Sequence, residues 1–163
     1  MTLDEHCNLL GRLVGHFQSL EYILRGFLQE LPSARPIGIP YGTDIYSLSV
    51  GAELPESEIT SYDSLDDLIK KFNIEMKKQG LSTIDKKVLV DVRDALAHGR
   101  VSSSTPDDNM RLLKFDSPKN GCVHIVFNQQ MDEAWFKAQI TRVKQAILAI
   151  TQLCPNKAEL IRS

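Results

Sequence analysis

The sequence has little cysteine, no excess of charge of either sign and no long apolar run, and each shortage excludes a class of protein. Its only cysteines are Cys7, Cys122 and Cys154, and they form neither a CxxC pair nor a cluster with zinc-ligand spacing. No run reaches the roughly eighteen apolar residues that a membrane-spanning helix needs. The N-terminus, MTLDEHCNLLGRLVGH, carries acids where a secretory signal would carry basic residues before an apolar core. We therefore expect a cytoplasmic protein that has no contact with a membrane and holds no metal, cofactor or disulfide.

The charge balance excludes a protein whose whole surface attracts nucleic acid. Lysine and arginine number 19 and aspartate and glutamate 21, for a net charge of −2. Any contact with RNA or DNA must then use a local basic patch. The 163 residues are 42% hydrophobic, which is enough for one compact core. We expect a single domain over residues 1–163.

The first predicted helix spans residues 2–31. Thr2 followed by Glu5 has the pattern of a capping box, and Pro32 stops the helix. Apolar residues recur at alternating steps of four and three, with Glu21 as the exception. The stripe comprises positions 3, 7, 10, 14, 17, 21, 24, 28 and 31, and Leu13, Leu20, Ile23 and Phe27 widen it.

Three further helices and one hairpin are predicted after a long loop over residues 32–60, in which Asp44–Val50 is expected to be extended. The helices cover residues 63–79 (ended by Gly80), a segment from Ser82 or Thr83 to about Gly99, and residues 131–154 (ended by Pro155). Between the last two, residues 110–128 form two short runs joined by Pro118-Lys119-Asn120-Gly121, a strong hairpin signal. The expected fold is mainly all-α: an antiparallel four-helix bundle with a β-hairpin inserted between the third and fourth helices.

The stretch RDALAHGR at the end of the third helix carries the candidate chemistry. Asp94 and His98 are four residues apart and are neighbours on a helix, so the carboxylate can fix the imidazole. Arg93 and His98 lie about 140° apart around the axis. Arg100 shares a face with Arg93 if the helix continues. A proton-transfer group beside fixed positive charge suits phosphodiester chemistry.

The same residues also have a purely structural interpretation. His98 can cap the helix, and Arg93 can be a surface or ion-paired residue. Glu21 can form a structural ion pair with Arg93 or Arg25, or it can belong to the site. The other histidines, His6, His16 and His124, are expected to be surface or ordinary packing residues.

The motif Arg93-Asp94-x3-His98, late in the third helix, resembles that of the HEPN superfamily (higher eukaryotes and prokaryotes nucleotide-binding domains), an all-helical fold. The long first helix, with LEYILRGFL, is similar as well. Some members carry a tyrosine two residues after the histidine, where this chain has Arg100. The resemblance implies a metal-independent endoribonuclease that acts as a homodimer with one composite site. His98 would be the general acid and base, Arg93 would stabilise the phosphate, and Asp94 would orient the site.

Three functions remain open at this point. The first is this ribonuclease, as a toxin or phage-defence effector with a cognate antitoxin or other partner protein. The second is a non-catalytic module of the same fold that binds RNA, a nucleotide or a protein. The third is a structural dimer in which the motif is only a capping cluster. Arg100 and Glu21 are the candidate binding residues beside the catalytic set.

Overall fold

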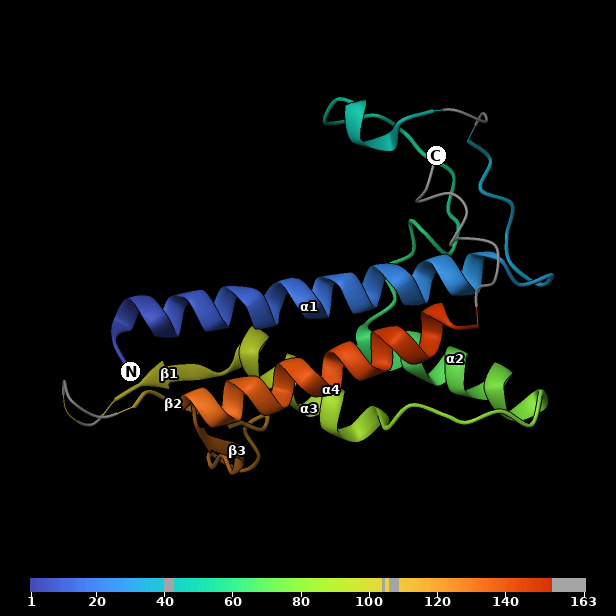
Figure 1. Ribbon diagram of the computed structural model, residues 1–163. Helices are drawn as coiled ribbons and strands as arrows, with labels where there is room; N and C mark the ends of the chain where they lie inside the picture. The colour runs from blue at the N-terminus through green and yellow to red at the C-terminus, as the bar shows by residue number, and fades with distance from the viewer. Residues whose placement is uncertain (40–42, 104, 106–108, 154–163) are drawn as a thin grey trace. The chain divides into compact units, whose positions relative to one another are not determined.

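The chain is mainly helical and carries a small antiparallel sheet (Figure 1). The computed structural model describes residues 1–39, 43–103, 105 and 109–153. The elements are the helices α1 (Leu3–Gln29), α2 (Leu65–Lys78), α3 (Lys86–His98) and α4 (Glu133–Thr151), the 3-10 turn η1 (Ile45–Ser47), and the strands β1 (Arg100–Ser102), β2 (Arg111–Phe115) and β3 (Ile125–Gln130). No helix in the described part of the chain is long and apolar enough to cross a membrane.

The internal contacts separate two compact units, and α1 and α4 contribute to both. The first unit comprises Met1–Leu20 and Ile84–Ala149, and the second comprises Glu21–Thr83 with the end of α4 from Ile150. The first unit therefore holds α3, the sheet and most of α4. The expectation of one domain over residues 1–163 stays a prediction.

Local capping signals set the helix starts, with one exception. The Thr2 and Glu5 capping box is confirmed, because each side chain bonds the other residue's backbone N–H, at 3.2 and 2.8 Å. Ser64 and Asp67 form a second box at the start of α2. The prediction that Ser82 or Thr83 caps the third helix was wrong. Its N-cap is Asp85, whose side chain makes no capping bond.

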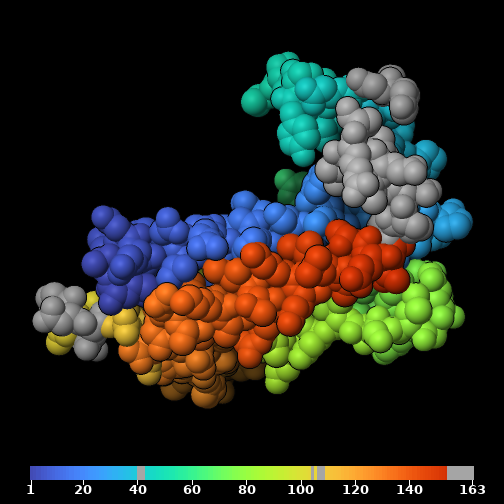
Figure 2. Space-filling view, in the orientation of Figure 1, coloured from blue at the N-terminus to red at the C-terminus, as the bar shows by residue number. Residues whose placement is uncertain are grey.

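The buried face of α1 differs from the predicted stripe in its first half. Leu3 is 61% exposed and Val14 is 38% exposed, whereas Leu13 and Leu20 are fully buried. Two residues expected only to widen the stripe, Leu13 and Leu20, are thus core residues of the first unit together with Phe17 of the predicted stripe. In the first unit they pack with residues of α3, β2 and α4, while the other side of α4 is exposed (Figure 2). The core side chains of this unit include Leu13, Phe17, Leu20, Leu89, Val92, Ala95, Leu112, Met131, Phe136, Ile140 and Val143.

In the second unit, α1 fixes the residues that precede α2. The Arg25 guanidinium donates to the backbone carbonyls of Ser61 and Asp63, at 2.8 and 2.7 Å. Lys71 of α2 bonds the carboxylates of Glu58 and Asp63. The expected extended piece at Asp44–Val50 contains the turn η1 instead, because the Asp44 carboxylate accepts a bond from the Tyr46 N–H and closes a tight turn.

The sheet has three strands in the order β1-β2-β3, where a two-stranded hairpin was expected. Asn120 and Gly121 have φ values of 52° and 79°, and Lys119 and Cys122 exchange backbone hydrogen bonds around them. This is the turn that Asn-Gly predicts between β2 and β3. The added strand, β1, pairs with β2 and begins two residues after His98. The predicted end of the last helix, with Cys154 and Pro155, lies outside the described residues.

His6 is a core residue, with only 3% of its surface exposed. Its ring meets Phe136 edge-on at 5.3 Å between centroids, and its Nδ1 has no hydrogen-bond partner among the described residues. Burial lowers the pKa of His6 below its usual value of 6.5, because a charged imidazole would lose its hydration there. Burial therefore favours the neutral form of His6 in the folded chain.

We expect the chain to lose stability as the pH falls below about 6.5, and His6 to contribute to the loss. The unfolded state binds the proton first because its histidine pKa is higher, so protonation favours unfolding from that pH down to the lower folded-state value. Urea unfolding at pH 7.5 and 5.5 measures this change. His6→Leu should show a smaller drop in the midpoint between the two pH values. An equal drop in both proteins would assign the loss to other groups, of which His16, with a pKa also lowered by burial, is the first to examine.

Candidate functional site

The motif residues lie on the last two turns of α3, in the first unit. Arg93 and Asp94 are half-buried, and His98 is the last residue of the helix and is exposed. A local sequence signal thus places an accessible imidazole at the end of α3.

Gly99 ends the helix as expected, but for a different physical reason. Its φ and ψ are −80° and −179°, an extended conformation that any residue can adopt. The constraint is space, because a Cβ on Gly99 would collide with the carbonyl oxygen of Ala95 and would lie 2.8 Å from the Leu113 oxygen and the Leu112 Cδ1. Only glycine lets the chain turn from α3 directly into β1 while β2 passes this closely.

Asp94 contacts Lys114, a residue that no sequence pattern had indicated as part of the site. The Lys114 Nζ lies 3.2 Å from Asp94 Oδ2, and the Arg93 Nη1 lies 3.8 Å from Asp94 Oδ1. Lys114 reaches Asp94 because β1 follows α3 at once and pairs with β2, which brings β2 beside the end of α3. Two sequence signals were available for this contact: the run RVS shortly after the histidine, which forms β1, and the lysine in the run LLKF, which lies in β2. The chain between these two runs was interpreted only as a loop.

The expected bond between Asp94 and His98 is not formed. In the described part of the chain, no hydrogen bond or ion pair reaches the His98 imidazole, and the Asp94 carboxylate is occupied by Lys114 and Arg93. Within one chain His98 is therefore free to meet a ligand, but Asp94 does not orient it. The motif instead presents an exposed imidazole beside two cations that share one carboxylate.

Arg100 is two residues from His98, but its side chain does not join Arg93, Asp94 and Lys114. The helix ends at His98, so the condition for Arg93 and Arg100 to share a helical face is not met. Arg100 pairs with Leu113 across the strands, and its guanidinium carbon lies 5.2 Å from the centre of the Phe115 ring. Neighbouring residues of a strand point to opposite faces, so Arg100 and Lys114 occupy opposite faces of the sheet.

Glu21 is half-buried and belongs to the second unit, whereas the motif belongs to the first. Of its two expected partners, Arg25 uses its guanidinium to hold Ser61 and Asp63. The role of Glu21 in the site stays a prediction.

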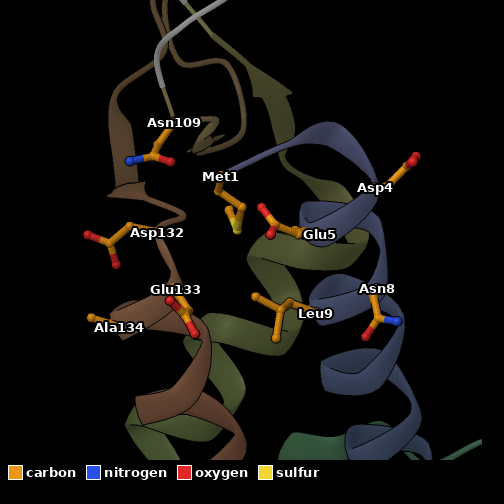
Figure 3. Close-up of a pocket in the computed structure, with 9 residues that line it drawn as sticks. All are labelled: Met1, Asp4, Glu5, Asn8, Leu9, Asn109, Asp132, Glu133 and Ala134. Atoms are coloured by element: carbon orange, nitrogen blue, oxygen red, sulfur yellow. The ribbon is translucent and has the colours of Figure 1, made fainter.

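A separate pocket of about 900 Å³ in the first unit opens between the start of α1 and the start of α4 (Figure 3). Glu5 and Leu9 point toward the segment that carries Glu133, while Asp4 points away from it. The lining residues are Met1, Asp4, Glu5, Asn8, Leu9, Asn109, Asp132, Glu133 and Ala134. Four of them are acids and none has a basic side chain, so the charge of these side chains opposes the binding of a phosphate.

No group of three or more histidine, cysteine, aspartate or glutamate side chains that could hold a metal ion is found among the described residues. Cys7 and Cys122 are free and exposed, and Cys154 lies outside the described residues.

No family model, curated protein or solved structure matches this chain.

Proposed function

We propose that this chain is a HEPN-like, metal-independent endoribonuclease whose site is composed of Arg93, Asp94 and His98 from two copies of the chain. The supporting observation is the exposed His98 imidazole, which bonds no residue in the described part of the chain, one turn beyond a half-buried arginine, with Lys114 as a second nearby cation. In this proposal the helices pack as an antiparallel four-helix bundle. The protein acts in the cytoplasm as a toxin or defence effector, and an antitoxin or other partner protein restrains it.

The proposed reaction is attack of a ribose 2′-OH on the adjacent phosphate. The O2′–P bond forms and the P–O5′ bond breaks, which leaves a 2′,3′-cyclic phosphate and a free 5′-OH. One imidazole accepts the proton of the 2′-OH, and an imidazolium gives a proton to the departing 5′ oxygen. Arg93, which stays charged at any physiological pH, stabilises the negative charge that develops on the phosphate. Lys114 adds positive charge and holds the Asp94 carboxylate away from the phosphate.

Two copies are needed because of helical geometry. Arg93 and His98 point about 140° apart around α3, so one helix cannot easily direct both side chains at the same phosphate. In a twofold dimer, each α3 faces its counterpart, and Arg93 of one copy can approach His98 of the other. The two imidazoles then supply the base and the acid.

The product ends test this chemistry directly. We expect the wild-type protein to cleave single-stranded RNA in the presence of a metal chelator and to leave 2′,3′-cyclic phosphate and 5′-OH ends. Mass spectrometry of the products distinguishes them from the 5′-phosphate products of water-mediated cleavage. Cleavage that the chelator abolishes, or products with 5′-phosphates, would contradict the proposed mechanism.

One observation favours a second candidate function, a non-catalytic module that binds RNA or a nucleotide. Asp94 is held by Lys114 and does not orient His98, so a proton-transfer role lacks its expected support within the chain. A cation pair without an oriented base would bind phosphate but would not cleave it. Binding without multiple turnover by clean protein would select this function over the first.

A further inference from the structure

The strand register gathers two arginines on one face of the sheet. Arg100 lies opposite Leu113, and Arg111 lies opposite Ser102 on one side and Gln130 on the other. Because side chains alternate between the two faces of a strand, these positions share a face with Phe115. We name this surface the arginine face, and it comprises Arg100, Arg111, Leu113, Phe115, Asn128 and Gln130.

The arginine face is not the face that packs on the core. The opposite face carries Leu112, which is fully buried, and Lys114, which contacts Asp94 of α3. On the arginine face both arginines and both amide residues are exposed, while Leu113 and Phe115 are half-buried between them. Its polar groups are thus available to a ligand from outside.

The charge of this face is local and of one sign. The whole chain has a net charge of −2, yet the strand positions that define the face carry two guanidiniums and no carboxylate. An arginine guanidinium binds phosphate through paired hydrogen bonds and stays charged. The face is therefore complementary to an anionic chain.

The face also offers stacking surfaces. The Arg100 guanidinium carbon lies over the Phe115 ring, 5.2 Å from its centre, so the half-buried ring supports the exposed guanidinium from behind. Aromatic rings and guanidinium planes are the groups on which proteins stack unpaired bases, and amide side chains bond the edges of bases. Asn128 and Gln130 supply such amides on the neighbouring strand.

We propose that the arginine face binds single-stranded RNA and guides it to His98. This inference rests on the proposed function, because it names the path of that enzyme's substrate. The chain between His98 and Arg100 spans at most about 7 Å, so an RNA strand on the face runs beside the end of α3. Single strands are expected because bases inside a duplex cannot stack on protein groups.

Binding can be measured independently of cleavage with a fluorescent ten-nucleotide 2′-O-methyl oligouridine, which lacks the attacking hydroxyl. Fluorescence anisotropy over a salt series gives both the affinity and its salt dependence. We expect Arg111→Gln to weaken binding roughly five- to tenfold at low salt and to reduce the slope of log K against log salt by about 0.7, the loss of one phosphate contact. Phe115→Leu should weaken binding about fivefold or more with an unchanged slope, since it removes stacking.

The matched control is Lys137→Gln on α4. Lys137 is 69% exposed and pairs with Glu133, so its loss changes the net charge as Arg111→Gln does but leaves the arginine face intact. It should bind like wild type. Arg111 is exposed, so Arg111→Gln should fold even if Phe115→Leu does not, and circular dichroism checks both. A duplex of the same length should bind more weakly than the single strand.

No binding by wild type, equal binding of Arg111→Gln and wild type, or equal binding of duplex and single strand would overturn the inference. These outcomes are separate from those of the proposed function. If cleavage needs His98 but Arg111→Gln binds RNA as tightly as wild type, the arginine face is not the RNA-binding surface and the proposed nuclease function still stands. If the wild-type protein binds RNA as expected but never cleaves it, the proposed nuclease function is wrong, while the arginine face remains an RNA-binding surface.

Discussion

The His98→Ala protein is expected to cleave RNA at least about a hundredfold more slowly than wild type. General acid and base catalysis contributes roughly 10²–10⁴-fold to a rate, and in the proposed dimer both proton transfers use this residue. His98 is exposed at the end of α3 and bonds no described residue, so its removal should leave the fold intact. Cleavage of a fluorescent RNA at matched protein concentration, with unfolding midpoints measured beside it, provides the comparison.

His124→Ala is the matched control for that experiment. His124 is also exposed, but it bonds Asp116 in the segment between β2 and β3 and is remote in sequence from the motif. It should retain wild-type cleavage. Equal activity of His98→Ala and wild type would exclude the proposed role of His98 and would point to a contaminating nuclease.

Subunit mixing tests the composite site. The proposed site needs the His98 imidazoles of both copies, so a dimer with one wild-type and one His98→Ala chain should be inactive. After random exchange of equal amounts, about a quarter of the dimers carry two wild-type chains, so activity should fall to roughly a quarter of that of the same amount of wild-type dimer. A fall to only about a half would show that each chain acts alone.

Gly99→Ala is expected to be the most destabilising single methyl addition in the motif. The new Cβ would collide with the Ala95 carbonyl oxygen and would lie 2.8 Å from the Leu113 oxygen, and both are backbone atoms that cannot move without disturbing α3 or β2. Overpacking of this kind costs about 2–3 kcal/mol in the free energy of unfolding. The melting temperature should fall by roughly 5–10 °C, which calorimetry or circular dichroism will measure.

Gly11→Ala and Gly15→Ala provide the opposite control. Both glycines lie inside α1, and a Cβ at either position meets no atom within 4 Å. Alanine is the better helix former by about 0.5–1 kcal/mol, so each change should stabilise the chain. A Gly99→Ala protein as stable as wild type would show that β2 does not approach the end of α3 as closely as described.

The sequence alone determined the features that depend on a few neighbouring residues. The capping box of Thr2 and Glu5 and the Asn120-Gly121 turn both follow from local backbone chemistry. The order and approximate extent of the four helices also followed, because apolar periodicity is local. The candidate residues Arg93, Asp94 and His98 were chosen from sequence and stand together at the end of one helix for the same reason.

Only the tertiary structure decided which groups meet across the chain. The strand β1 is only three residues long, which is too short to be recognised from a sequence pattern. It forms because β2 provides partners for its backbone hydrogen bonds. Its pairing brings Lys114 to Asp94, separates Arg100 from Arg93 and leaves no room for a side chain at Gly99. The packing of neighbouring elements likewise determined which face of α1 is buried. Leu13 and His6 are buried, whereas Leu3 and Val14 are exposed. Contacts between residues far apart in sequence depend on packing, and no local pattern encodes them.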